Sequence, residues 1–583
     1  MRPNEIPAWQ EGALPILPND RLEEEIERLD MTVTAVDALV KKMPSGASAL
    51  SEAVYMVDRG RDLAKTLLTV CRARLSLSVS DQTVAPMRSR VRRLSERLEA
   101  DAALILEAVR VLPADQQKEP VFAVWLREST VPAPDDLKLV TAGMASPLRN
   151  LHSHLFSTMK LHATNSDGRT ITMSYAQAVA VLKASDDLML RRSVFSGFNA
   201  WLAEHSPSFA DLLNAMLGFR LFKLRAEKAD LSHCFLQGDR LSHRGFSAMD
   251  EAIEAALPRI RECVSLRAKL LGMNRLPVSA VLSSAPGEAD DADPTHDIRD
   301  SISFIGRSMQ KATDVFPTFL KEANDGHWID MRRQSGRAGG GWCDDLPSKK
   351  AVALFGNYQN NMAGLGNLAH TLGVGFLHRQ LHDLSALEKR VPLSMIEVAG
   401  LLCETMVDRA MLAETRSEKT APLALWQTMR RTSNMLLILP VRHRLALSLM
   451  KARCEGVLSL TDINRLSREA WEHYLGDTTD GCDQYLWAWK QHFYRTDVFF
   501  YDWQYTFGYL LSQHLAKRFE RHGVTAAGVD FADFCRETAT LTCDELVKRH
   551  LDADITDPAF WSAAVDEALK PLVETRSLLA DDD

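Results

Sequence analysis

The sequence predicts a mainly α-helical protein with one small β-sheet. Long segments carry apolar residues three and four positions apart, which is the period of a helix that buries one face. Patterns typical of strands are few, and the best is Ala351–Phe355. The chain has 583 residues, enough for one large domain or several smaller ones.

The first expected helix covers residues 21–40. Asn19 or Asp20 is placed to cap it, and residues 23–25 are glutamates, which suit the positive end of a helix dipole. A later segment, 247–271, has Ser247 as a candidate cap. A kink or break is expected there at Pro258, because proline lacks the backbone N–H and clashes with the preceding turn. The same spacing predicts further helices over 51–77, 85–111 and 174–195.

Three stretches interrupt the helical pattern. Residues 336–341 are rich in glycine and precede the predicted strand. They do not match the phosphate-loop pattern GxxxxGK[ST], so we expect a tight turn there. Residues 283–297 are small and acidic with few apolar side chains, which predicts a solvated loop. A shorter break is expected over 132–136.

The charge balance argues against a nucleic-acid partner. The chain has 69 basic and 77 acidic residues, a net charge of −8, and no long basic run. Its first residues, MRPNEIPAWQEG, lack the apolar core of a signal peptide. The most apolar window, 435–450, is interrupted by Pro440 and three basic residues, so it cannot span a membrane. Nine dispersed cysteines suggest reduced thiols. We therefore expect a cytoplasmic protein without a membrane partner.

One helical segment carries a fragment of a metal-binding motif. In the zinc motif H-E-x-x-H, the two histidines lie one turn apart on one face and the glutamate activates the metal-bound water. Here the corresponding string is His370-Thr371-Leu372-Gly373-Val374. One histidine is present, Thr371 stands at the base position, and Val374 stands at the second ligand position. A single histidine in a helix usually has a structural role, so this string needs support from other segments.

Three other segments supply that support. Residues 396–407 read IEVAGLLCETMV, which places Glu397 27 positions after His370 and Glu404 seven positions further on. Residues 339–358 read GGGWCDDLPSKKAVALFGNY, and residues 492–511 read HFYRTDVFFYDWQYTFGYLL. The segment around His370 reads LAHTLG. In this order and spacing, the four segments resemble the oligoendopeptidase F / thimet oligopeptidase family of zinc metallopeptidases. The clear resemblance covers about residues 328–512.

The resemblance implies a large helical bundle split by a deep internal channel, with the small β-sheet beside the former active site. It also suggests four regions. These are an N-terminal helical region over 1–112, an N-terminal lobe over 113–205, a metallopeptidase-like domain over 206–575 and a frayed acidic tail over 576–583.

The resemblance assigns a role to each matching position. His370 and Glu397 correspond to zinc ligands, and Glu404 to a carboxylate that orients a ligand. The family's catalytic glutamate is replaced by Thr371, which cannot act as a base near neutral pH. Val374 has no lone pair for a metal. Side chains expected to act on or bind substrate in the cleft are His492, Tyr501 and Tyr505 as catalytic residues, and Tyr494, Cys343 and Trp342 as substrate-binding residues.

Two other residues are candidates to complete the set of metal ligands. His378 lies eight residues after His370, about 12 Å away on a straight helix, so it can join the site only if the helix breaks near Gly373 or Gly375. Glu404 can instead come forward as a third ligand. No cofactor is expected unless such an altered site keeps zinc. Cys343 and Cys403 fall on segments expected to face the cleft, where a cysteine–histidine pair would be nucleophilic; a buried apolar role is the simpler interpretation.

Three functions follow from these observations. The first is a pseudopeptidase that binds a peptide or peptide-like ligand without zinc hydrolysis. The second is a repurposed, metal-free enzyme acting on a small metabolite or carrier-bound intermediate, with His370 and Glu397 as an acid–base pair. The third is a surviving metallopeptidase that uses His370, Glu397 and Glu404. Loss of the motif separates the third function from the first two.

Overall fold

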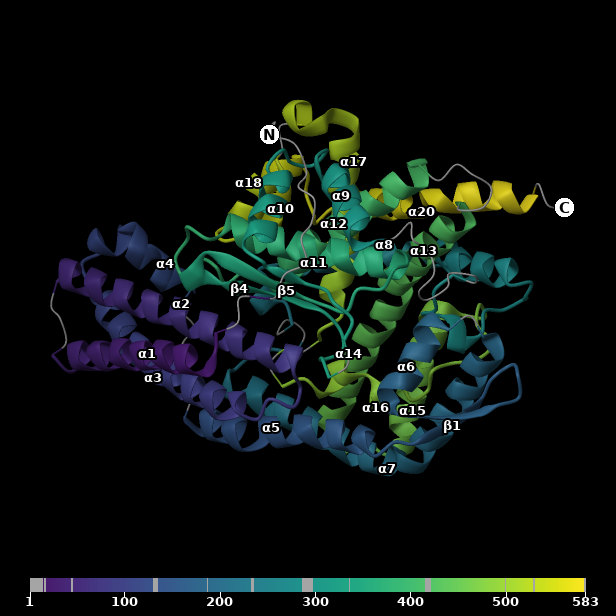
Figure 1. Cartoon of the computed structure of the whole chain (residues 1–583), viewed down its shortest axis with the longest axis horizontal. Helices are drawn as coiled ribbons and strands as arrows, with labels where there is room; N and C mark the ends of the chain where they lie inside the picture. The colour runs from purple at the N-terminus through teal and green to yellow at the C-terminus, as the bar shows by residue number, and fades with distance from the viewer. Residues whose placement is uncertain are drawn as a thin grey trace.

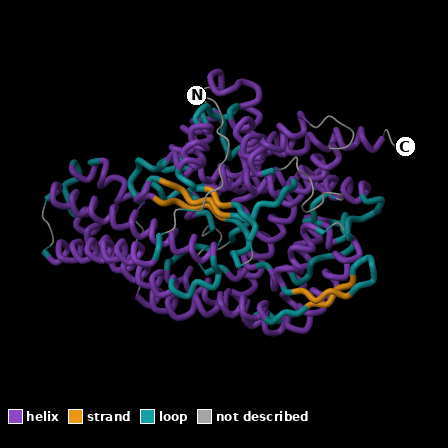
Figure 2. The backbone as a smooth tube through the Cα atoms, viewed as in Figure 1, coloured by secondary structure: helices purple, strands orange, loops and turns teal. Residues whose placement is uncertain are grey.

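A computed structural model describes most of the chain. The described residues are 14, 17–42, 46–128, 135–185, 187–231, 235–285, 297–334, 336–414, 421–496, 498, 500–527 and 530–580. Helices dominate them, and the strands form two small sheets (Figure 1, Figure 2). This confirms the predicted mainly α-helical class. Among the described residues, no helix is both long and apolar enough to cross a membrane.

The elements follow one another in this order: α1 (Asn19–Lys41), α2 (Ala47–Leu77), α3 (Val84–Arg110), α4 (Pro120–Glu128), α5 (Asp135–Ser157), β1 (Leu161–Thr164), β2 (Thr170–Met173), α6 (Tyr175–Ala184), α7 (Leu188–Ala226), α8 (His243–Leu270), α9 (Ile298–Met309), α10 (Phe316–Asp325), β3 (Ile329–Asp330), β4 (Trp342–Leu346), β5 (Ala351–Phe355), α11 (Met362–Gln380), α12 (Leu393–Glu414), α13 (Ala421–Ser433), α14 (Leu439–Glu455), α15 (Leu460–Leu475), α16 (Leu486–Trp489), α17 (Trp503–Ala527), α18 (Phe531–Glu537), α19 (Cys543–Leu551) and α20 (Pro558–Ala580). A short π-helix, Asn434–Ile438, joins α13 to α14.

The three N-terminal helices pack side by side at one end of the molecule (Figure 1). Buried apolar residues recur along α1 every three or four positions, from Leu22 to Val40. The predicted cap of this helix is wrong. Pro18 occupies the cap position in an extended conformation and its carbonyl accepts from the N–H of Leu22, so Asn19 and Asp20 already belong to the first turn.

Two other helix predictions need correction. The segment 174–195 forms two helices, because Asp187 caps a new helix by accepting from the N–H of Leu190 at 2.8 Å. Helix α8 begins earlier than predicted, at His243, where Ser242 caps it in place of Ser247. It continues through Pro258 without ending.

The predicted loops and domain boundaries can be compared with the structure only in part. Most of the loop over 283–297 and of the break over 132–136 lies outside the described residues. Helix α7 runs without interruption through residues 205 and 206, where the sequence suggested a boundary. Residues 576–580 belong to α20, and 581–583 are not described.

The predicted strand is β5, at the centre of a three-stranded sheet in the order β3-β5-β4. Strand β4 runs antiparallel to β5, and β3 runs parallel to it. All five residues of β5 are buried, since α2 and α11 both pack against this sheet. The hairpin β1–β2, which the sequence did not predict, lies apart from it (Figure 2). The central sheet therefore links the N-terminal helices to the helix that carries His370.

Helices α11 and α12 approach each other closely at Gly373. A Cβ atom built there would lie 2.4 Å from the backbone oxygen of Ala399 and 2.9 Å from the Cβ of Cys403. Neither contact can be relieved by moving the end of a flexible side chain. Helix α11 is continuous through Gly373 and Gly375, so it does not break to bring His378 to His370. The close approach instead brings His370 against α12.

We expect Gly373→Ala to lower the free energy of unfolding by about 1–3 kcal/mol, the usual cost of overpacking a core. Urea unfolding followed by circular dichroism would measure it. Gly143→Ala in α5 is the matched control, because a Cβ there meets no atom within 4 Å. Equal stability of the two variants would show that α11 and α12 separate easily.

Candidate functional site

A cleft of about 790 Å³ lies between the N-terminal helices and the helices that carry the motif. Side chains of α2, α3 and β4 line one side, and side chains of α11, α12 and residues 495–505 line the other. No role was predicted for the first hundred residues, yet side chains of α2 and α3 line this cleft. The predicted site residues that line the cleft are Trp342, Cys343, His370, Thr371, Glu397, Tyr501 and Tyr505.

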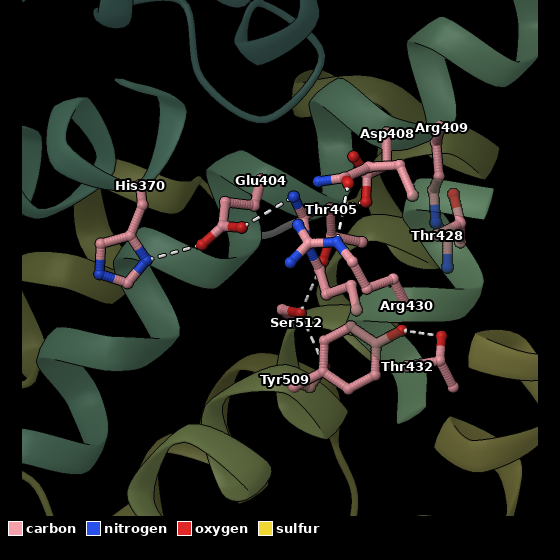
Figure 3. Close-up of polar contacts among 12 residues, drawn as sticks. His370, Glu404, Thr405, Asp408, Arg409, Thr428, Arg430, Thr432, Tyr509 and Ser512 are labelled. Atoms are coloured by element: carbon pink, nitrogen blue, oxygen red, sulfur yellow. Dashed lines mark hydrogen bonds and ion pairs between the residues drawn. The ribbon is translucent and has the colours of Figure 1, made fainter. Parts of the chain in front are cut away.

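His370 is held by two carboxylates of α12. Its Nδ1 donates to Oε1 of Glu404 at 2.8 Å (Figure 3). Its Nε2 lies 3.5 Å from Oε2 of Glu397. The imidazole ring lies against the backbone of α12 at Gly400, where a Cβ would come within 2.5 Å of the ring. Glycine at this position therefore makes the placement of His370 possible. Glu404, not Glu397, forms the close hydrogen bond with the histidine.

Glu404 is in turn fixed by a buried arginine. Arg431 of α13 places one terminal nitrogen 2.9 Å from Oε2 of Glu404 and the other 2.5 Å from Oδ2 of Asp408. Glu404 and Asp408 are four residues apart on α12, so they lie on the same face. The side chains of all three residues are at most 12 % exposed. Both oxygens of Glu404 are therefore already bonded within the protein.

The pKa values of the three groups differ because their partners differ. Burial raises the pKa of Glu397 to about 7, although the His370 charge and the Tyr505 hydroxyl oppose this. Burial also acts against the charged form of Glu404, but Arg431 and His370 outweigh it and hold its pKa below the usual range. Burial disfavours protonated His370, yet the bond to Glu404 and the nearby carboxylate charges raise its pKa above the ordinary value.

Thr371 and Val374 present no metal ligand and no base to the cleft. The hydroxyl of Thr371 donates to the backbone carbonyl of Asn367 at 2.8 Å, one turn back in its own helix. Val374 is buried and lines the cleft only with its methyl groups. Zinc in a metallopeptidase is held by three protein ligands. Here only His370 Nε2 and Glu397 face each other, since Glu404 is engaged elsewhere. Among the described residues, no three His, Cys, Asp or Glu side chains are grouped so that they could hold a metal ion.

Two tyrosines, Tyr501 and Tyr505, also line the cleft. The hydroxyls of Tyr501 and Tyr505 lie 2.8 Å apart. His492 does not line the cleft but packs edge-on against the ring of Tyr501, and its Nδ1 donates to Asp502 at 2.9 Å. The guanidinium of Arg495 lies 4.3 Å from the centre of the Tyr501 ring. His492 and Arg495 thus set the position of Tyr501.

Tyr494 and Cys403, like His492, lie away from the cleft lining. Tyr494 is only 1 % exposed and packs against His152, with ring centres 4.0 Å apart. Cys403 is fully buried against Gly373, which agrees with the buried apolar role that was the simpler interpretation. Cys343 is half-buried and does line the cleft. Burial raises the pKa of both thiols well above the ordinary value, which disfavours a thiolate nucleophile.

Ion pairs join segments that line the cleft. Lys389 binds Asp62 of α2 at 3.0 Å, and Lys65 and Arg72 of α2 both pair with Asp344 of β4. These residues were not predicted from the sequence, because the partners are hundreds of positions apart. Arg431 and Asp408 were not predicted either. The only available signal was the four-residue spacing of Glu404 and Asp408, which also occurs on ordinary solvated helices.

Two relatives match part of this chain in sequence. The oligoendopeptidase F homolog of Lactococcus lactis subsp. lactis (strain IL1403) is 21 % identical over 397 residues, which cover 64 % of this chain and 62 % of that protein. The plasmid oligoendopeptidase F of Lactococcus lactis subsp. cremoris is 23 % identical over 332 residues, covering 54 % and 51 %. This chain therefore spans less than two thirds of each relative's length. No model of a known protein family matches it.

Solved structures show the same fold over nearly the whole chain. Oligoendopeptidase F from Enterococcus faecium superimposes with a TM-score of 0.69 at 13 % identity, covering 97 % of this chain and 100 % of that one. PZ peptidase A, solved with an inhibitor, gives a TM-score of 0.74 at 16 % identity, covering 94 % and 97 %. The chain is similar in part of its sequence to oligoendopeptidase F relatives, and it shares the fold of these solved structures. In this chain, His370 lies 2.8 Å from Glu404 and 3.5 Å from Glu397, while Thr371 and Val374 follow His370 on the same helix.

Proposed function

We propose that this oligoendopeptidase F-like protein binds a peptide or peptide-like ligand in its cleft and does not hydrolyse it by a zinc mechanism. One observation carries the proposal. The cleft is intact, while the two positions that would supply the base and the second metal ligand hold a threonine bonded to its own helix and a buried valine.

The lining of the cleft suits an extended peptide. Its volume of about 790 Å³ lies within the range of small-ligand sites. Trp342, Tyr501 and Tyr505 offer rigid aromatic surface with polar tips, which is typical of binding hot spots. Trp342 is held by a hydrogen bond from its indole nitrogen to Ser76 Oγ at 3.0 Å and by stacking on Phe355. These aromatic groups can pack on apolar side chains of a peptide, while the hydroxyls of Tyr501 and Tyr505 contact its backbone.

A peptide hydrolase also needs a group that activates water. The Thr371 hydroxyl cannot do so near neutral pH, and it is already used as a donor to Asn367. Glu397 is the nearest cleft carboxylate, but its Oε2 faces His370. We therefore propose that the protein binds a peptide but does not cleave it by a zinc mechanism.

We expect the natural chain to bind fluorescent peptides from a random pool of about 6–12 residues, with affinity unchanged by a metal chelator. Tyr501→Ala should weaken binding at least about tenfold, because loss of a central tyrosine typically costs more than 1 kcal/mol. Fluorescence anisotropy would measure both. Tyr55→Ala is the control, since Tyr55 is 61 % exposed on α2 and does not line the cleft.

The same samples test the absence of hydrolysis. Mass spectrometry of the peptides after incubation with added zinc should show no cleavage. Cleavage that a chelator abolishes would contradict the proposal and favour a metallopeptidase with an altered site. A folded protein that binds no peptide in the pool, with Tyr501→Ala indistinguishable from it, would contradict the recognition step.

A further inference from the structure

A second cavity lies along α12, beyond Glu404. Its volume is about 510 Å³, and its walls come from α12, α13, α17 and α20. We call it the rear cavity. Figure 3 shows His370 on one side of Glu404, and Asp408, Arg409 and Thr428 of the rear cavity on the other. None of the candidate site residues lines it.

A continuous chain of charged contacts links the two cavities. His370, which lines the cleft, donates to Glu404; Glu404 pairs with Arg431; Arg431 pairs with Asp408, which lines the rear cavity. The contacts measure 2.8, 2.9 and 2.5 Å. All are largely buried, so bulk water screens them little. Arg431 is shared between two carboxylates, and a change at one must alter its hold on the other.

The other charges of the rear cavity are paired with one another. Arg409 binds Glu520 at 2.7 Å and the side-chain oxygen of Gln513 at 2.9 Å. Glu567 is paired with Lys570 at 2.5 Å and also with Lys517. These contacts neutralise the cationic groups with protein carboxylates, so the cavity has no ready site for an anion.

Asp408 differs from these groups. Its Oδ2 binds Arg431, and among the described residues no hydrogen bond or ion pair to its Oδ1 is found. The residue is only 8 % exposed. Burial raises its pKa to about 6, although Arg431 opposes this. A nearly buried carboxylate that lines a cavity favours a hydrogen-bond donor that carries positive charge.

We propose that the rear cavity binds a primary ammonium group at Asp408 and that its occupant changes how Glu404 holds His370. An ammonium group next to Asp408 competes with Arg431 for this carboxylate. The ion pair between Arg431 and Glu404 then becomes stronger, and the hydrogen bond between Glu404 and His370 becomes weaker. Leu412 and Ala413 line the same cavity and can contact the alkyl part of the ligand. The cleft and the rear cavity are coupled through direct contacts, because groups in both act on the position of Arg431.

Calorimetric titration with n-butylamine at pH 7.5 tests the site. We expect saturable binding, and none with n-butanol, which lacks the charge. Asp408→Asn should weaken binding at least tenfold. Because this substitution can disturb Arg431, Ala413→Trp is the second variant; it fills the cavity from an exposed position and should also abolish binding. Equal binding of butanol, or butylamine binding unaffected by Ala413→Trp in a folded protein, would overturn the site.

A second arm distinguishes two sources of the ammonium group. Trialanine amide presents an amino terminus, and its N-acetylated form lacks the charge. Competition of trialanine amide with butylamine, lost on acetylation, would identify a peptide amino terminus as an acceptable occupant. Binding of butylamine alone would restrict the site to small amines. If neither amine binds, the proposal is wrong.

The coupling has its own readout. In protein labelled at the histidine Cε1 position, the His370 signal, assigned with His370→Gln, should shift as butylamine saturates the rear cavity. In Arg431→Lys, which keeps the charge but cannot bridge two carboxylates with a planar fork, the shift should be lost. Saturable butylamine binding with an unmoved His370 signal would overturn the coupling. None of these measurements depends on a peptide in the cleft, so they stand apart from the proposed function.

Discussion

The Thr371→Glu, Val374→His double variant is expected to retain about one zinc ion per chain after dialysis, whereas the natural chain should retain far less. Both positions line the cleft on α11, and Val374 lies one helical turn after His370. A histidine there would add the imidazole ligand that the donor set lacks, beside His370 and Glu397. Elemental mass spectrometry of the dialysed proteins measures the difference.

The two single variants separate the contributions. Val374→His should recover most of the zinc affinity, because it adds a ligand, and Thr371→Glu should recover little. Circular dichroism must show that all four proteins are equally folded. About one zinc ion per chain in the natural protein would contradict the proposal that it has no zinc mechanism. A folded double variant without zinc would show that Glu404 and Arg431 hold His370 too firmly to release it.

Arg431→Met is expected to lower the free energy of unfolding by about 3–5 kcal/mol, the usual effect of removing one partner from a buried ion pair. The substitution leaves Glu404 and Asp408 facing each other without the cation, and both are nearly buried. Methionine keeps much of the side-chain volume, so the loss reports on charge and hydrogen bonding. Urea unfolding followed by tryptophan fluorescence measures it.

Arg430→Met is the matched control, because Arg430 neighbours Arg431 on α13 and is less buried. We expect it to cost much less. Replacing all three groups, as Glu404→Gln, Arg431→Met and Asp408→Asn, should recover part of the stability lost in the single variant, since no unpaired charge remains. A single variant as stable as the control would mean that water or the rear cavity already compensates these carboxylates.

The helices and the central strand follow from local patterns, and the sequence predicts them well. Apolar spacing located α1, α2 and α3 to within a few residues, and β5 has the predicted bounds. The predicted helix bounds were wrong where a capping residue interrupts the apolar spacing of a helix. Asp187 starts a new helix within an apolar repeat that is otherwise unbroken, and Pro258 is accommodated inside α8. The outcome of this competition between capping and apolar spacing depends on the strength of capping hydrogen bonds. Apolar spacing along the sequence does not report that strength.

The candidate site divides in the same way. The resemblance in motif order and spacing placed His370, Glu397, Tyr501 and Tyr505 at one cleft, and the structure brings them together. It did not separate Tyr494 from that group. Successive residues of a tight turn point in different directions, and Tyr494 packs into the core on His152.

The sequence by itself determined the helical class and the presence of a threonine at 371 and a valine at 374, because apolar spacing and residue identity are properties of the chain alone. Only the tertiary structure decided what holds His370. The contact with Glu404, the bridge through Arg431 to Asp408 and the rear cavity all join separate helices. Helix packing sets these distances, and it depends on close approaches at Gly373 and Gly400 that spacing along the chain does not reveal.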